Sequence, residues 1–373
     1  MKHLIIDISS HGLGHLAQTA LVINSLDTNK IRLTVRTKIS EEILKERIQH
    51  PFDLIPYQQD IGMIMHDALQ VDAKATMKWY QDFHATYTLR KKQAARDLET
   101  LKPDLVFADI PYLSLDACSL IDVPSIALCS LNWADIFQAY CGHFNGAAII
   151  HDDIVNAYSK AQYFLQATPS MPMDNLSNLH AISPIAQKGE KQTTKLRNCV
   201  QKPDTTRFIL VALGGIGMQY PLESWPQIDD VSWIFDDAAL YLQREDFIAK
   251  SLIDLSYTDL LASCDVILTK TGYGTQTEAV VNRIPTLCVA RGDWPEEPYL
   301  FEWHQRHGIV DFLHWQNIGT QNFRTQIECM LEQDWNQKTL NPTGAGEAAA
   351  IIHDLLYPLH PSRQSLPNQE LAP

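Results

Sequence analysis

Two histidines stand in a glycine-bearing segment near the start of the chain, where a strand is expected to end and a helix to begin. The segment follows the apolar run Leu4–Ile8 and reads HGLGH, from His11 to His15. An imidazole in the first turn of a helix can act as a general base, and we expect the helix dipole to lower the pKa of His15 and keep it neutral. The alternative is that one or both histidines only hydrogen-bond the loop.

The glycines of this segment have counterparts in the second half of the chain. Glycine lets the backbone approach a ligand, and the N–H groups at a helix start attract anions. Ligands of open α/β sheets bind beyond the carboxyl ends of the strands, so we expect both loops to contact a nucleotide in one cleft. Neither loop matches the full dinucleotide fingerprint, and a plain tight turn is the alternative. The glycines assigned to this site are Gly12, Gly14, Gly214, Gly215 and Gly217.

The segment TKTGYGTQTEAVVNRIP, Thr269–Pro285, follows a third apolar strand. Its backbone N–H groups can bind a diphosphate. Glu278, about one turn into the expected helix, can accept hydrogen bonds from a ribose diol, or it pairs only with the helix dipole. The residues assigned to the nucleotide site are Thr271, Gly272, Tyr273, Gly274, Thr275 and Glu278.

A charged segment, Arg291–Gly308, follows the next apolar strand and therefore belongs to the same sheet edge. We assign Arg291, Glu296 and Glu297 to sugar or phosphate contacts and consider Asp293 as a further candidate. A merely solvated loop is the alternative. The scattered histidines, including His143 and His151 beside Asp152, show no ligand spacing, so we expect no metal.

Alternating apolar strands and amphipathic helices predict an α/β protein with a parallel sheet in each half. We expect two Rossmann-like domains that face each other across a cleft. The predicted boundaries are a first domain over 1–186, a linker over 187–206, a second domain over 207–357 and a disordered tail over 358–373. One long helix is predicted over Met77–Leu101.

The composition excludes several classes of function. The chain has 373 residues and a formal net charge of −14, which argues against a general nucleic-acid binder. No stretch is long and apolar enough to cross a membrane. The seven cysteines form no C-x-x-C pair and indicate reduced thiols in the cytoplasm. The sequence does not indicate an oligomeric state.

Taken together, the motifs resemble a known family. The series HGLGH, PDLVFAD, LGGIG and TKTGYGTQTEAVVNRIPTLCVAR is similar to glycosyltransferases of the GT-B fold. Within that fold it resembles the peptidoglycan N-acetylglucosaminyltransferases of the MurG type (family 28). It also resembles the glycosyltransferase-like N-terminal region of plant L-arabinokinases, which carries a similar glycine–histidine loop and K-x-GYGT-x-x-E signature.

The resemblance implies that the domain over 1–186 binds the acceptor and that the domain over 207–357 binds the nucleotide sugar, and it implies a role for particular residues. It makes His15 the base that deprotonates an acceptor hydroxyl, with Asp109 as its partner and Asp116 as the second candidate. It assigns Glu278 to the ribose, and Glu296 and Glu297 to the donor sugar, where MurG-like enzymes carry paired glutamines.

The expected activity is inverting transfer of a sugar, without a metal or cofactor, from a nucleotide-diphosphate sugar, expected to be UDP-linked, to a hydroxyl acceptor. A nucleotide-sugar hydrolase or epimerase on the same fold is an alternative, and so is a non-catalytic nucleotide-sugar-binding protein.

Overall fold

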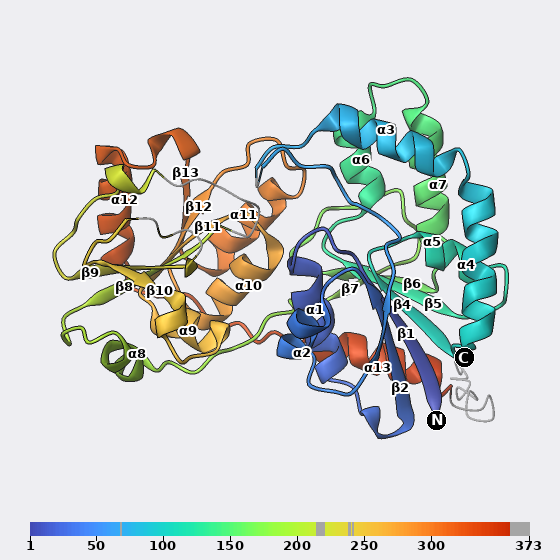
Figure 1. Ribbon diagram of the computed structural model, residues 1–373, viewed down its shortest axis with the longest axis horizontal. Coiled ribbons are helices and arrows are strands. Elements are labelled where there is room, and N and C mark those ends of the chain that lie inside the picture. The colour runs from blue at the N-terminus through green and yellow to red at the C-terminus, as the bar shows by residue number, and fades with distance from the viewer. Residues whose placement is uncertain (68, 214–220, 238–239, 241, 359–373) are drawn as a thin grey trace, which may run out of the picture.

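Two parallel β-sheets form the centres of the two halves of the chain (Figure 1). The computed structural model describes residues 1–67, 69–213, 221–237, 240 and 242–358. The seven-stranded sheet of the first half has the order β3-β2-β1-β4-β5-β6-β7, and the six-stranded sheet of the second half has the order β10-β9-β8-β11-β12-β13. The strands are β1 (Lys2–Ile8), β2 (Ile31–Thr37), β3 (Asp53–Pro56), β4 (Leu105–Asp109), β5 (Ser125–Cys129), β6 (Tyr163–Ala167), β7 (Leu179–Ile182), β8 (Arg207–Ala212), β9 (Val231–Phe235), β10 (Phe247–Ala249), β11 (Val266–Lys270), β12 (Thr286–Val289) and β13 (Val310–Leu313).

Helices cover both sheets, as the alternation of strands and helices predicts. Every pairing between neighbouring strands is parallel, and the central strands are buried along nearly their whole length. The helices are α1 (Gly14–Asn24), α2 (Glu41–Arg47), α3 (Ala73–His84), α4 (Tyr87–Leu101), α5 (Leu113–Cys118), α6 (Trp133–Cys141), α7 (Ala147–Tyr158), α8 (Thr193–Cys199), α9 (Tyr257–Ser263), α10 (Tyr273–Asn282), α11 (Glu297–His307), α12 (Gln321–Leu331) and α13 (Gly344–Leu356). No described helix is both long enough and apolar enough to span a bilayer.

The single helix expected over Met77–Leu101 is wrong, because the structure has α3 and α4 in its place. The chain leaves the helical conformation at Thr86, between the two. The break occurs although the apolar spacing continues across it, since Phe83 and Tyr87 are four residues apart and their rings pack at 6.1 Å. Both rings also lie next to the ring of Tyr112, which precedes α5. The period of the apolar residues therefore could not show where the first helix ends.

The last helix, α13, returns to the first half, whereas the expected second domain extended to residue 357. It packs against α1 and β7 and lies beneath the first sheet (Figure 1). The N–H of Gly344 donates to the carbonyl of Pro184 at 3.1 Å, and the carboxylate of Glu347 accepts from the N–H of Ser183 at 2.9 Å. Apolar side chains such as Ile352 then join the core of the first half. Sequence order did not reveal this crossing because it depends on contacts between distant segments.

The segment expected as a linker is fastened to the second half. It contains α8, and the N–H of Gly189 donates to Asn282 at 2.8 Å, while that of Gln192 donates to Ser263 at 2.8 Å. The expected tail lies outside the described residues except for Pro358.

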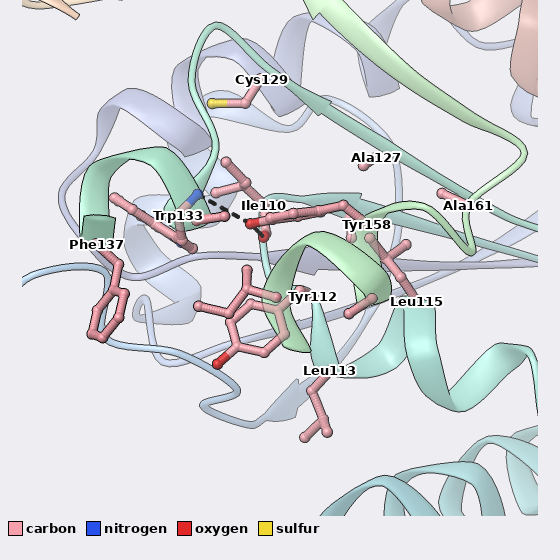
Figure 2. Packing of buried hydrophobic residues seen from close by; sticks show 14 of the residues in the cluster. Ile110, Tyr112, Leu113, Leu115, Ala127, Cys129, Trp133, Phe137, Tyr158 and Ala161 are labelled. Atoms are coloured by element: carbon pink, nitrogen blue, oxygen red, sulfur yellow. Dashed lines mark hydrogen bonds between the residues drawn. The ribbon is translucent and has the colours of Figure 1, made fainter. Parts of the chain in front are cut away.

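A buried aromatic cluster supports the ends of β4 and β5 (Figure 2). The hydroxyl of Tyr158 donates to the carbonyl of Ile110 at 2.8 Å and accepts from the backbone N–H of Trp133 at 3.4 Å. Ile110 directly follows Asp109 in the chain. One buried phenol therefore fixes both the backbone beside Asp109 and the start of α6.

Candidate active site

His15 and Asp109 meet where two neighbouring strands end. β1 and β4 pair in parallel with Ile8 opposite Asp109, so the loop after β1 and the last residue of β4 lie at one sheet edge. The Nδ1 atom of His15 lies 2.9 Å from Oδ1 of Asp109, and Thr19, one turn further along α1, donates to Oδ2 at 2.8 Å. Asp109 is fully buried. The carboxylate therefore orients the imidazole, and Thr19 orients the carboxylate.

The pKa of His15 is shifted in the opposite direction to the one expected from the helix dipole. Burial alone lowers the pKa of His15, but the negative charge of Asp109 and the hydrogen bond to it outweigh burial and hold the pKa well above its ordinary value. The start of a helix is equivalent to only about half of a positive elementary charge, whereas the carboxylate of Asp109 places a full negative charge beside the ring. The effect of Asp109 on the pKa is therefore the larger one. Once deprotonated, this imidazole is a stronger base than an isolated one.

Asp116, the second candidate partner, lies elsewhere. Its carboxylate is 3.2 Å from Nζ of Lys91, on the side of α5 that faces α4. Among the described residues His15 hydrogen-bonds Asp109 and not Asp116, so the structure brings Asp109 to the histidine.

The first glycine loop turns sharply before α1. Gly12 has φ +91°, a conformation that favours glycine, and Gly14 opens the helix. A Cβ at either position would meet no atom within 4 Å, so both glycines border open space. Gly214, Gly215 and Gly217 lie outside the described residues.

The helix α10 begins at Tyr273, close to the first half. Gly272 and Gly274 also border open space. The buried hydroxyl of Tyr273 accepts from the N–H of Ile185 at 2.8 Å and donates to the carbonyl of Thr168 at 3.0 Å. The side chain of Tyr273 therefore joins the two halves of the chain. The backbone at Gly272 and Gly274, in the same segment, stays open to a ligand.

Glu278 is buried, and it interacts electrostatically with Arg47 and Tyr257, two residues that line a pocket of about 1170 Å³ between the halves. Burial raises its pKa to about 7, and Arg47 of α2 partly opposes this rise. The guanidinium of Arg47 lies 5.8 Å from the ring of Tyr257, and Nζ of Lys250 lies 5.4 Å from the same ring. Thr275 also hydrogen-bonds Tyr257. Residues that line the pocket include Leu21, Asn24, Arg47, Lys188, Lys250 and Tyr257.

The two glutamates expected at the donor sugar make protein contacts of their own. Glu297 accepts from the hydroxyl of Thr271 at 2.6 Å and from the backbone N–H groups of Arg291 and Gly292 at 2.7 and 3.1 Å. Its carboxylate thus ties the segment after β12 to the segment after β11. Glu296 accepts from the hydroxyl of Ser130, in the first half, at 2.6 Å. Burial raises the pKa of Glu296.

Two cationic side chains, Arg291 and Lys270, lie at the edge of the second sheet where β11 and β12 end. The sequence analysis assigned only Arg291 to the site. Arg291 stacks its guanidinium 3.8 Å from the ring of Trp294, and its Nε has no partner among the described residues. Burial and the charge of Arg291 lower the pKa of Lys270, the last residue of β11, to about 8. Two cations at one sheet edge, one of which lowers the pKa of the other, mark a candidate site for an anion. The signal for Lys270 was present in the sequence, in the K-x-GYGT pattern.

Three other groups at this site were missed as functional residues. Asp60, Trp133 and Trp294 are all buried close to the histidines, and nothing in their spacing links them. Trp133 packs its ring at 5.7 Å from His15. These residues come together only in the folded chain, where the segment before α3, which carries Asp60, and the start of α6, which carries Trp133, pack against the glycine loop.

The His15–Asp109 pair, together with Cys129, also forms a group of the kind that can hold a metal. His15, Asp109 and Cys129 each offer an atom, and these atoms lie within 4.8 Å of one another. Burial raises the pKa of the Cys129 thiol, which disfavours the thiolate that a metal would need. Nδ1 of His15 is already hydrogen-bonded to Asp109. The arrangement therefore suits proton transfer better than metal binding.

Comparison with known proteins gives the fold. No family model matches the chain. The L-arabinokinase of Arabidopsis thaliana is 22% identical over 305 residues, covering 80% of this chain and 29% of that protein, so the chain spans less than a third of its relative. The crystal structure of CalG4, the calicheamicin glycosyltransferase, superposes with a TM-score of 0.61 at 14% identity and covers 97% of this chain and 100% of that one.

The chain has the GT-B fold. Two further structures share it. Arabidopsis thaliana UGT89C1, complexed with UDP-L-rhamnose, gives a TM-score of 0.58 at 12% identity over 95% of this chain and 99% of that one. The UDP-GlcNAc 2-epimerase of Methanocaldococcus jannaschii gives 0.56 at 14% identity over the same shares. The GT-B fold thus hosts both transfer and epimerisation, and the site must distinguish them.

Proposed function

We propose that this GT-B protein is an inverting glycosyltransferase that moves a sugar from a nucleotide-diphosphate sugar to a hydroxyl acceptor. The observation that carries the proposal is the buried His15–Asp109 pair at the start of α1, next to the second half. Nδ1 is held by the carboxylate, which leaves Nε2 to take a proton from the acceptor hydroxyl. The negative charge of Asp109 then stabilises the imidazolium that forms.

The donor is proposed to bind the second half. Its diphosphate would lie at the start of α10, where the N–H groups of the first turn are joined by Lys270 and Arg291. Cations and helix N–H groups stabilise the charge that develops on the departing diphosphate, so this site supplies without a metal what a metal would otherwise supply.

The nucleoside is proposed to extend from the diphosphate past Glu278 into the pocket of about 1170 Å³. Glu278 would accept from the ribose hydroxyls, and the ring of Tyr257 offers an apolar wall for a base. The complex of UGT89C1 with UDP-L-rhamnose favours a UDP-linked donor. The seven free cysteines suit a reducing compartment such as the cytoplasm.

The test is product analysis with a panel of UDP-, dTDP- and GDP-linked sugars. A thermal-shift screen first selects the nucleotide, because a bound ligand raises the unfolding midpoint. Release of the nucleoside diphosphate is then followed with and without hydroxyl acceptors, and the anomeric configuration of the product is read by NMR. Acceptor-dependent release with inversion is expected from wild type, and release slower by about 10² to 10⁴-fold is expected from His15→Ala.

The epimerase structure supports one alternative, an epimerase or hydrolase on the same fold. Free sugar or an isomerised nucleotide sugar formed without an acceptor would favour that alternative over transfer. Binding of a nucleotide sugar with no turnover under any condition would instead favour a non-catalytic binding protein.

A further inference from the structure

The ring of His11 is held by two tryptophans that come from opposite halves of the chain. Trp133 meets it edge to face at 5.2 Å between centroids, and Trp294 lies nearly parallel to it at 6.5 Å. Gly62 makes this possible, because a Cβ there would lie 2.6 Å from Cγ of His11 and 2.7 Å from the ring of Trp133. The proposed mechanism assigns no role to this histidine.

Each of the two indoles is anchored in the same way, by a buried carboxylate that also binds a serine. In the first half, Asp60 accepts from Nε1 of Trp133 at 2.7 Å and from the hydroxyl of Ser9 at 2.9 Å. The oxygen of Ser9 in turn accepts from the backbone N–H of His11 at 3.3 Å. The anchor therefore fixes both the wall of the His11 site and the backbone of His11 itself.

The second anchor crosses between the halves. Glu296 accepts from Nε1 of Trp294 at 3.1 Å and from the hydroxyl of Ser130 at 2.6 Å. Trp294 and Glu296 belong to the second half and Ser130 to the first. Trp294 is also buried in the apolar core of the first half. His11 therefore has its second wall only when the halves are docked.

These contacts fix the tautomer of His11. Its Nδ1 lies 3.0 Å from the carbonyl of Ile61, which can only accept, so Nδ1 carries the proton and Nε2 is left as an acceptor. Burial lowers the pKa of His11 to about 3, with smaller contributions from the positive charges of His15, Arg291 and Lys270. The ring is therefore neutral at physiological pH. Among the residues that the structure describes, none hydrogen-bonds to Nε2.

Shared ring contacts show where His11 lies in the proposed reaction. Trp133 packs against both His11 and His15, which would bind the attacking hydroxyl, and Trp294 packs against both His11 and Arg291, which would bind the departing diphosphate. The transferred sugar must lie between the attacking hydroxyl and the departing diphosphate, because its anomeric carbon forms a bond to the hydroxyl oxygen as its bond to the diphosphate breaks.

We propose that His11 is a specificity-determining residue whose Nε2, held between Trp133 and Trp294, accepts a hydrogen bond from a hydroxyl group of the transferred sugar. The inference rests on the proposed function and extends it. A sugar without that hydroxyl would leave a desolvated nitrogen unpaired, and sites of this kind reject such analogues strongly.

The experiment compares binding of a sugar nucleotide with binding of its parent nucleoside diphosphate by calorimetry. The panel of UDP-, dTDP- and GDP-sugars identifies the sugar that binds wild type more tightly than its parent nucleotide does. His11→Phe keeps a planar ring but has no acceptor, and His11→Gln restores one. His353→Phe, at an exposed position on α13, is the matched control.

We expect His11→Phe to lose about tenfold of the affinity that the sugar adds, which corresponds to one good hydrogen bond, with affinity for the parent nucleotide unchanged. His11→Gln should recover part of it, and His353→Phe should match wild type. In wild type, NMR of the imidazole nitrogens should show the Nδ1–H tautomer from pH 5 to 8.

Other outcomes separate the two proposals. If His11→Phe keeps the full contribution of the sugar, or loses affinity for the sugar nucleotide and its parent equally, the role of His11 is wrong while the proposed function stands. A protonated or Nε2–H imidazole at pH 7 would also overturn the role. If wild type binds none of the nucleotides, the proposed function fails and this inference with it.

Discussion

In each half of the chain a helix begins just after a central strand of the sheet, but the side chains around the two helix starts differ. In the first, β1 runs through the glycine loop into α1, and in the second, β11 runs into α10. The helix α1 presents His15 to a buried carboxylate, whereas α10 carries no acidic residue in its first turn and has Lys270 and Arg291 beside it. The repeated architecture supplies the position, and the side chains decide whether that position suits a proton or a phosphate.

The largest expected effect comes from removing the proton acceptor in the first half. His15→Ala should lower turnover by about 10² to 10⁴-fold, which is the usual contribution of a positioned general base. Donor affinity should stay within about twofold, since His15 is proposed to contact the acceptor hydroxyl and not the donor. Steady-state turnover and calorimetry with the selected sugar nucleotide measure the two quantities. Parallel losses of turnover and affinity would show that the halves do not divide the work in this way.

The next effect concerns the second half. Lys270→Gln should weaken binding of the nucleoside diphosphate by about tenfold to 100-fold, as expected for one hydrogen bond between charged groups. Because the pKa of Lys270 is about 8, its charge is present below that pH and is lost above it. Wild-type affinity should therefore fall as the pH rises past 8, and the variant should not show this fall. An identical pH dependence in both proteins would contradict the assignment.

A smaller but sharper effect is expected on the pH profile of turnover. The base must be deprotonated, and Asp109 raises the pKa of His15, so kcat/KM should rise with pH through a midpoint above about 6.5. In Asp109→Asn that midpoint should move to lower pH because the negative charge is gone, and the maximal rate should also fall. Rates measured from pH 5 to 9 provide the test. A midpoint that does not move would mean that another group controls the profile.

The smallest effect compares the two serines that anchor the indoles. Ser9→Ala and Ser130→Ala each remove a hydrogen bond to a buried carboxylate, and each should cost about 1 kcal/mol of unfolding free energy in urea. The second bond joins the halves and the first does not. Only Ser130→Ala should therefore increase the radius of gyration in small-angle scattering. Equal radii in the two variants would show that this bond does not hold the halves together.

Much of the architecture could be predicted from local sequence patterns. Buried runs such as Leu4–Ile8, followed by glycines and by apolar residues at helical spacing, predict strand–loop–helix units without any knowledge of distant contacts. The positions of His15 and of the segment from Thr271 to Glu278 follow from the same patterns. Their meeting with the rest of the site does not.

Long-range packing decided what these patterns left open. The pairing of His15 with Asp109, 94 positions away, depends on β4 lying beside β1, and it reversed the expected shift in the pKa of His15. A motif also cannot show which atoms a side chain already satisfies, so the hydrogen bonds of Glu296 and Glu297 came only with the structure.

The sequence by itself determined that the chain has two α/β halves, each with a helix start at a sheet edge, because strands and helices follow from the local period of apolar residues. Only the tertiary structure decided which charges face one another across those edges, how α13 returns to the first half and how two tryptophans hold His11. The reason is physical: burial and charge act through space, and the distances between residues such as Asp60, Trp133 and Trp294 are fixed by packing and not by their separation along the chain.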